Sequence, residues 1–124
     1  MRLRTFFMIA AVVALIYAVG LLLAPEFMNS TYGFGTSSSE TLLARFFGVD
    51  LLVVGLILWM GRDLNSVSTR PIVSANLIGD LVGFIIAAAG TLSGVMNGFG
   101  WTAVLIYLLL ALGFAYFQFM APAI

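Results

Sequence analysis

Apolar residues fill four long stretches of the chain, and most polar residues gather in the short segments between them. The apolar stretches cover residues 5–24, 41–60, 72–93 and 101–120. Each has about 20 residues, the length that an α-helix needs to cross the hydrocarbon core of a bilayer. The pattern therefore predicts an all-α fold, a four-helix bundle integral to a membrane, in which residues 1–124 form one transmembrane domain.

The polar segments hold residues that typically begin and end helices. Pro25 follows the first apolar stretch and is expected to stop it, so residues 25–39 are predicted to form a loop at the membrane surface. Ser37–Ser39 with Glu40 offer N-cap chemistry for the second helix, and Pro71 fits the first turn of the third. The first stretch is longer than the 7–15 apolar residues of a signal peptide, and no clear cleavage site closes it, so we expect a retained helix.

Composition excludes several classes of function. Hydrophobic residues make up 63% of the chain and charged residues only 8%, with five arginines and no lysine, histidine or cysteine. Soluble domains carry about 25% charged residues. Disulfides, thiolate chemistry, zinc sites and axial haem histidines are excluded, and we expect no metal and no cofactor. Zero net charge without a basic run argues against a nucleic-acid partner.

The placement of arginines predicts the orientation in the membrane. Arg2 and Arg4 precede the first helix, and Arg62 and Arg70 flank the connection that returns to the same side after two crossings. The connections 25–39 and 94–100 contain no basic residue. The positive-inside rule therefore predicts a multi-pass protein of the cell (inner) membrane with both termini cytoplasmic.

A short internal similarity supports this arrangement. Met28-Asn29 with Gly33-Phe34-Gly35 resembles the segment 96–100, and both lie at the outer turn of a predicted hairpin. The pattern is compatible with two parallel hairpin repeats.

Three ionisable side chains lie inside the apolar stretches, namely Arg45, Asp50 and Asp80. A charge at the centre of a membrane helix costs roughly 2.5–3.5 kcal/mol on insertion scales, so we expect each of these side chains to have a polar partner or a functional role. From the helical rise, both acids fall near the middle of the bilayer. One cation near two carboxylates predicts a buried ion pair and one acid that keeps its proton. The expected buried polar cluster comprises Arg45, Asp50, Asn76, Asp80, Tyr17 and Tyr107.

Small residues mark the faces that we expect to pack. On the third helix, Asn76, Gly79, Asp80, Gly83, Ala87, Gly90 and Gly94 fall within one arc of roughly 100°. The spacing of these glycines is the small-x-x-x-small pattern, which lets helix backbones approach closely. On the second helix, Gly48 and Gly55 share a seam with Arg45, while Asp50 lies about 140° away. Asp50 is therefore expected to meet another helix, a second subunit or water.

Three segments carry a resemblance to a known group. They are LLLAPEFM at the end of the first helix, LLARFFGVDLL in the second and NLIGDLVG in the third, followed by a Gly-rich turn and an aromatic fourth helix. The chain resembles the DoxX-like group of small four-helix membrane proteins. The resemblance implies an accessory role, since some members are small subunits of oxidase or redox complexes, with Arg45, Gly48 and Asp80 most like a family core. Redox or metal chemistry is not carried over to a chain without Cys and His.

Three functions remain open. We favour a non-catalytic accessory or assembly subunit whose partners are membrane lipids and other membrane subunits or a second copy, because buried Arg–Asp pairs often fix helix register and partner choice. The alternative is a small transporter or proton-conducting oligomer that uses the Arg/Asp cluster. The third is an enzyme or binder of a lipid-soluble ligand such as a quinone, with Tyr116, Gln118 and the phenylalanines around them as a groove.

Overall fold

The computed structural model describes residues 1–120 and is all-α. The helices are α1 (Leu3–Leu23), α2 (Pro25–Thr31), α3 (Ser38–Met60), α4 (Ser66–Leu92) and α5 (Gly100–Ala115), which a π-helical turn, η1 (Tyr116–Met120), extends. Four segments are long and apolar enough to cross a membrane, namely α1, α3, α4 and α5 with η1. The prediction of four long apolar helices is confirmed. Residues 121–124 of the predicted domain lie outside the described part.

Two helix starts differ from the sequence prediction, and both have a local cause. α4 begins at Ser66, five residues before Pro71, because the Asn65 side chain caps it by accepting a hydrogen bond of 2.8 Å from the Ser68 amide. Pro71 therefore lies inside the helix and not at its start. The expected loop 25–39 contains a further helix, α2, in which Pro25 occupies the first turn and Glu26 is the acidic residue that favours a helix N-terminus.

The start of α3 agrees with the prediction. Ser37 is its N-cap, and the Ser37 and Glu40 side chains form a reciprocal capping box with each other's backbone amides. Gly33 has a φ of +86°, so the turn that precedes this cap uses the left-handed conformation that glycine adopts without strain. The capping box fixes where the second long helix enters the apolar layer.

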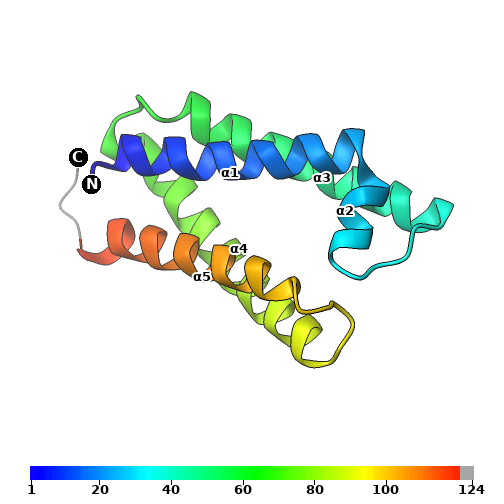
Figure 1. The fold of residues 1–124 in the computed structure, drawn as a ribbon. Helices are drawn as coiled ribbons and strands as arrows, with labels where there is room; N and C mark the ends of the chain where they lie inside the picture. The colour runs from blue at the N-terminus through cyan, green and yellow to red at the C-terminus, as the bar shows by residue number, and fades with distance from the viewer. Residues whose placement is uncertain (121–124) are drawn as a thin grey trace.

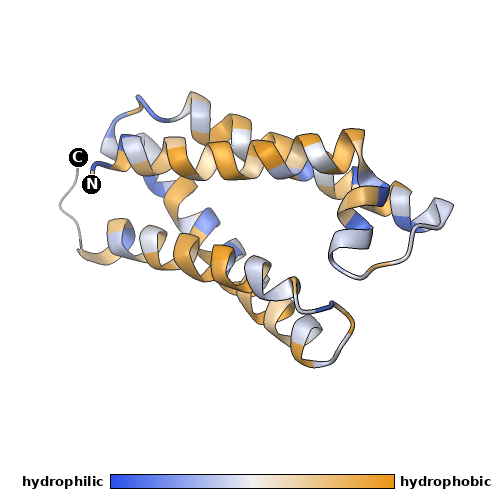
Figure 2. Ribbon diagram, in the orientation of Figure 1, coloured by the Kyte–Doolittle hydropathy of each residue, from blue (hydrophilic) through white to orange (hydrophobic). Residues whose placement is uncertain are grey.

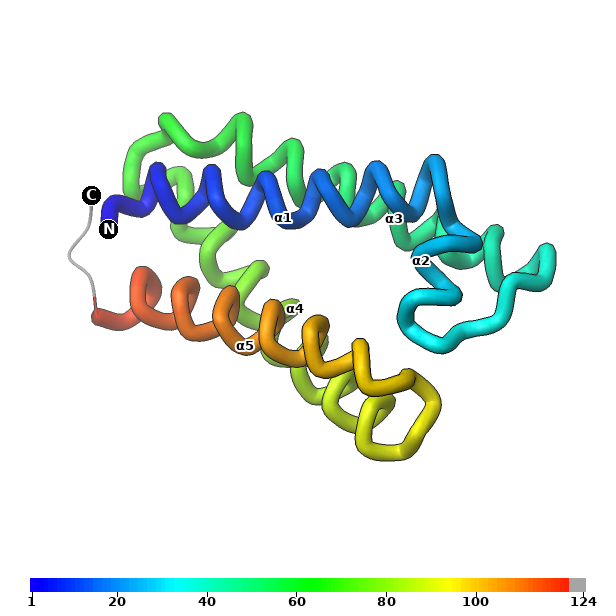
Figure 3. Tube along the Cα trace, viewed as in Figure 1, coloured from blue at the N-terminus to red at the C-terminus, as the bar shows by residue number. Residues whose placement is uncertain are grey.

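The long helices form two antiparallel hairpins, α1 with α3 and α4 with α5 (Figure 1). Contacts between helices are dense within each hairpin and sparse between the hairpins. The two hairpins lie close together at the end that carries Met1 and diverge toward the opposite end, where α2 folds back from the end of α1 (Figure 3). Most residues of the helices are apolar, as the orange colour of the ribbon in Figure 2 shows.

Aromatic side chains join the hairpins at the end that carries Met1. Phe7 and Phe114 are fully buried, and the rings of Phe6 and Phe114 pack edge to face with centroids 4.7 Å apart. Phe6 also packs against Phe117, and it covers Gly113, where a Cβ would overlap its ring. This aromatic contact between α1 and α5 holds the two hairpins together.

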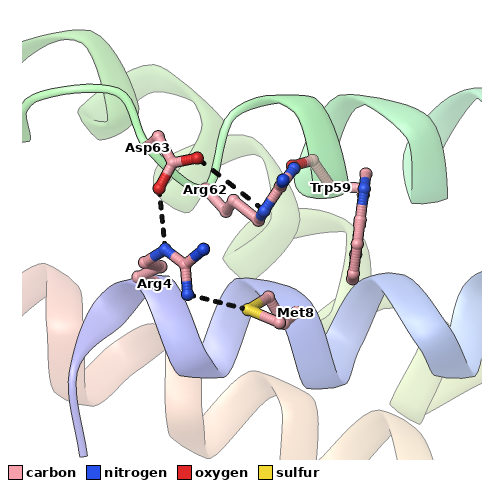
Figure 4. Close-up of polar contacts among 5 residues, drawn as sticks. All are labelled: Arg4, Met8, Trp59, Arg62 and Asp63. Carbon is pink, nitrogen blue, oxygen red and sulfur yellow. Dashed lines mark hydrogen bonds and ion pairs between the residues drawn. The ribbon is translucent and has the colours of Figure 1, made fainter.

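Polar side chains reinforce the same end at the surface. Arg4 Nε donates a hydrogen bond of 2.7 Å to Asp63 Oδ1, and the guanidinium of Arg62 stacks 4.5 Å above the Trp59 ring (Figure 4). Arg62 also donates to the Trp59 carbonyl and lies 3.8 Å from Asp63. The short connection between α3 and α4 is thus tied to the start of α1.

At the opposite end, the two outer turns bond to each other. The backbone amide of Asn97 donates to the Tyr32 carbonyl at 3.0 Å, and the Asn97 side chain donates to the Thr31 carbonyl at 3.1 Å. The hairpins are therefore connected at both ends, and the space between their middles is left open.

Candidate functional site

A cavity of about 620 Å³ lies between the two hairpins. All four long helices contribute to its wall, which is mostly apolar. Pockets for small molecules commonly have volumes of about 300–1,000 Å³ and a few polar groups on apolar walls. The polar residues of this wall are Tyr17, Asn29, Tyr32, Glu40, Asn76, Asp80 and Tyr107.

Small residues on the facing helix surfaces leave this space unfilled. Ala14 on α1, Ala44 on α3, Ala87 on α4 and Ala103 on α5 all line the cavity. The aromatic contact at one end and the bonded turns at the other fix the spacing of the hairpins, and such short side chains do not fill the gap between them. The cavity thus follows from where the large and small apolar residues stand in the sequence.

Asp80 is the acid in the middle of the cavity wall. It lies 12 residues from the end of α4 at Leu92, which is about 18 Å along the helix axis. Its Oδ2 atom is buried and has no hydrogen-bond partner among residues 1–120. A buried polar atom left unpaired costs about 1–3 kcal/mol, and more when it is charged.

The residues near Asp80 within residues 1–120 do not donate a hydrogen bond to its buried Oδ2 atom. The Asn76 side chain, one turn away, donates to the Ile72 carbonyl of its own helix at 2.9 Å. Tyr107 faces the same helix from α5, with its ring against Gly83, where a Cβ would overlap the ring. Glycine at this position leaves room for the Tyr107 ring beside α4, and both residues line the cavity.

A chain of hydroxyl groups crosses the outer half of the cavity. The Tyr17 and Tyr32 hydroxyls lie 2.6 Å apart, and the Tyr32 hydroxyl lies 3.4 Å from Thr102 Oγ1. Tyr32 is buried and packs edge to face against Phe99 at 5.2 Å. These hydroxyl contacts link α1 and α5 to the turn that follows α2, so they fix the positions of two tyrosine rings in the wall.

The cavity opens between α3 and α4. Its lining residues on those helices include Leu43 and Ile86, which are each 66% exposed, and Phe47, which is 46% exposed. The lining residues of α1 and α5 are buried or half-buried. α3 and α4 are adjacent in the chain but do not pack closely along their length. In a membrane this opening would face the lipid.

Arg45 and Asp50 do not lie on the cavity wall, and both are exposed. Arg45 Nε makes a hydrogen bond of 3.4 Å to the Leu22 carbonyl of α1. Asp50 lies on a different face of α3, as the 140° separation requires. The prediction of a buried ion pair is wrong, because the ion pairs within residues 1–120 join Asp63 to Arg4 and Arg62. The six-residue cluster therefore separates into four residues on the cavity wall and two on the outer surface of α3.

The predicted packing glycines also divide into groups. Gly48 and Gly55 pack on α1, since a Cβ would lie 3.0 Å from Leu21 Cβ at the first and 2.7 Å from Leu15 Cγ at the second. At Gly83 the neighbour is Tyr107, and at Gly90 it is Met96, which a Cβ would approach to 3.3 Å.

Two glycines of the predicted stripe do not pack against another helix. A Cβ at Gly79 or Gly94 would meet no atom of residues 1–120 within 4 Å. Gly94 has a φ of +84° and serves the turn that follows α4. Only part of the stripe on α4 is therefore a packing surface, since Gly79 is exposed and Gly94 lies in the turn after the helix.

Sequence reasoning missed the contribution of the first outer segment. Asn29 and Tyr32 are buried, and the Asn29 amide donates to the Glu40 carbonyl at 3.3 Å, which brings α2 against the start of α3. The signal was available in Pro25-Glu26, a pair typical of the first turn of a helix.

No group of three metal-ligating side chains is placed to hold a metal ion within the described residues. Comparison of the chain with family models, curated proteins and solved structures gave no match. The resemblance to DoxX-like proteins stays a prediction that rests on its three short segments.

Proposed function

We propose that this small membrane protein binds a lipid-soluble ligand in the cavity between its two hairpins. The observation that carries the proposal is the unpaired Asp80 carboxyl at mid-depth in a cavity of about 620 Å³. Apolar walls suit the hydrophobic part of such a ligand, and a few polar groups would fix its orientation. The proposal is for binding and includes no catalytic step.

The charge distribution supports a cytoplasmic location for both termini. Arg4 and Arg62 meet at Asp63 beside the start of α1, and Arg2 and Arg70 belong to the same end. We therefore propose an inner-membrane protein whose Met1 end faces the cytoplasm.

This orientation can be tested because the chain has no cysteine. Thr36→Cys and Leu64→Cys place single thiols in the two opposite connections. A membrane-impermeant maleimide added to intact cells should label the first and spare the second. The reverse labelling would contradict the orientation.

A cavity-filling variant tests the ligand proposal. Ala87 is buried on the cavity wall, whereas Ala89, two residues along the same helix, is exposed and does not line the cavity. Ala87→Leu should reduce the amount of small molecule that co-purifies with the protein in native lipid discs, and Ala89→Leu should leave it unchanged. Native mass spectrometry measures both. If Ala87→Leu retains the wild-type ligand content, the cavity is not the binding site.

A second candidate function is docking of a membrane subunit or a second copy on the outer face of α3. Exposed Arg45 favours it, since a charge that faces lipid is costly and a group on a partner helix can pair it. Val49→Cys on that face should then form a disulfide with an identical chain or a partner in native membranes, while Ile78→Cys on α4 should not. Absence of any cross-link at Val49 would argue against docking there.

The proton-conducting alternative has less support. It relied on Arg45 and Asp50 acting together with Asp80, and these two residues lie outside the cavity wall. We do not propose it.

A further inference from the structure

The charges of the cavity wall are of one sign. Among residues 1–120, its carboxyl groups are those of Glu40 and Asp80, and no arginine lines it. Within residues 1–120, Arg4 and Arg62 are engaged with Asp63 and Trp59, and Arg45 lies toward α1. The cavity therefore offers carboxyl groups with no internal counter-charge among residues 1–120.

The two acids of the wall differ in what holds them. Glu40 accepts a hydrogen bond of 2.6 Å from Ser37 Oγ as part of the capping box, so its carboxylate already has a partner. Asp80 has a buried oxygen without one. Of the two, Asp80 is the acid available to a ligand.

Aromatic rings surround the same space. Tyr17, Tyr32 and Tyr107 line the cavity together with Phe47 and Phe114. Ring faces attract cations, most strongly where water is excluded, by about 2 kcal/mol or more. A wall with an unpaired carboxyl and several rings is suited to a positively charged group with apolar substituents.

A further acid lies beside the opening. On α3, Asp50 is three residues after Phe47, four before Val54 and seven after Leu43, and all three of these residues line the cavity. Residues at these spacings are neighbours on a helix surface. Asp50 is 12 residues from Ser38, so it lies about 18 Å from the outer end of α3, and Asp80 lies at the same distance from the outer end of α4. Both acids therefore lie near the middle of their helices, Asp50 beside the opening and Asp80 on the cavity wall.

From these observations we infer that the ligand is an amphipathic cation, such as a hydrophobic quaternary ammonium or phosphonium ion, which reaches Asp80 from the lipid through the opening between α3 and α4. The inference rests on the proposed function and names its ligand class. The cation supplies the charge partner that Asp80 lacks, the rings contact its substituents, and Asp50 attracts it to the opening.

The test compares three probes of related shape and different charge. They are tetraphenylphosphonium, neutral triphenylphosphine oxide and anionic tetraphenylborate, each measured by equilibrium dialysis against the protein in phosphatidylcholine nanodiscs, with empty discs subtracted. The wild type should bind the cation at least about tenfold more tightly than either other probe, a factor that corresponds to about 1.4 kcal/mol. Equal affinity for the three probes, or a preference for the neutral or anionic one, overturns the inference.

Variants assign the effect to Asp80. Asp80→Asn keeps the shape and removes the charge, so it should abolish the preference for the cation, whereas Asp80→Glu should retain it. Asp50→Asn is the matched control, since it also replaces an aspartate near the middle of a long helix but outside the cavity wall, and it should weaken cation binding less than Asp80→Asn does. If Asp80→Asn keeps the preference, or if Asp50→Asn has the larger effect, Asp80 does not hold a cation.

The same measurements separate this inference from the function on which it rests. Ala87→Leu, which fills the cavity, should weaken binding of the phosphonium and the phosphine oxide alike, and Ala89→Leu should affect neither. If filling the cavity changes no probe, the proposed binding function fails. If filling the cavity weakens every probe while Asp80→Asn leaves their ratios unchanged, the cavity binds ligands but does not select cations.

Discussion

Gly55 and Gly79 were both expected to be packing glycines, but the structure predicts opposite effects on stability when each is replaced by alanine. Gly55 lies on α3 against α1, where a Cβ would come within 2.7 Å of Leu15 and 3.3 Å of the Ala11 carbonyl oxygen. At Gly79 on α4, a Cβ would meet no atom of residues 1–120 within 4 Å. We therefore expect Gly55→Ala to destabilise the protein and Gly79→Ala to leave it as stable as the wild type or more so.

The magnitudes follow from two opposing effects. Alanine is favoured over glycine in a helix by about 0.8–1.0 kcal/mol. At Gly55 the new methyl group would be about 0.7 Å closer to Leu15 than ordinary contact at 3.4 Å allows, and the carbonyl beside it belongs to the α1 backbone. Overpacking of this kind costs about 1–3 kcal/mol. The net expectation is a loss of about 1 kcal/mol for Gly55→Ala and a gain of up to about 1 kcal/mol for Gly79→Ala.

Both variants can be measured by unfolding in mixed micelles with rising mole fractions of sodium dodecyl sulfate. Circular dichroism follows the loss of helix, and in a Trp101→Phe background the fluorescence of Trp59, which packs against the core cluster, reports on α3. If Gly55→Ala unfolds with the wild type while Gly79→Ala is destabilised, the packing of α3 on α1 is wrong. The glycine stripe of α4 would then be the packing face.

Three further predictions use the same unfolding assay. Ser37→Ala removes the capping box with Glu40 and should cost about 1 kcal/mol, and a helical content unchanged from the wild type at every detergent fraction would contradict it. Phe114→Ala removes the buried ring that joins the hairpins and should cost about 3–5 kcal/mol, far more than the same change at an exposed phenylalanine. The hydrogen bond from Arg4 holds the pKa of the Asp63 carboxyl below its ordinary value, so the stability it adds is present above about pH 4 and is lost as the pH falls through the lowered pKa. Asp63→Asn should remove this acid dependence, and an unchanged pH profile would show that the pair contributes nothing.

The periodic and compositional signals of the sequence predicted the elements well. Four apolar stretches of membrane-spanning length are the four long helices, and Ser37 with Glu40 forms the expected cap. These features depend on residues close together in the chain. The early start of α4 could also have been predicted, because Asn65 is a typical N-cap residue. We expected a later start because Pro71 is typical of the first turn of a helix.

Contacts between residues far apart in the sequence could not be predicted from these local patterns. The cost of a charge in a membrane led to the expectation that Arg45 and Asp50 join Asp80, yet both lie on outer surfaces of α3. Helical phase shows which residues share a face, but it does not show which neighbour that face meets. The seam of Gly48 and Gly55 packs on α1, and this choice was not contained in the spacing of the glycines.

The size of the cavity and the state of Asp80 together limit what can occupy the space between the hairpins. The apolar wall of this cavity of about 620 Å³ lacks contact partners when the space is empty, so filling it with apolar groups stabilises the protein. Because it opens between α3 and α4, lipid chains can enter and satisfy its apolar wall, but a hydrocarbon chain offers nothing to the unpaired oxygen of Asp80. An occupant that carries both an apolar body and a polar or cationic group can contact the apolar wall and also pair with Asp80, so we expect it to bind this site more tightly than a lipid chain does.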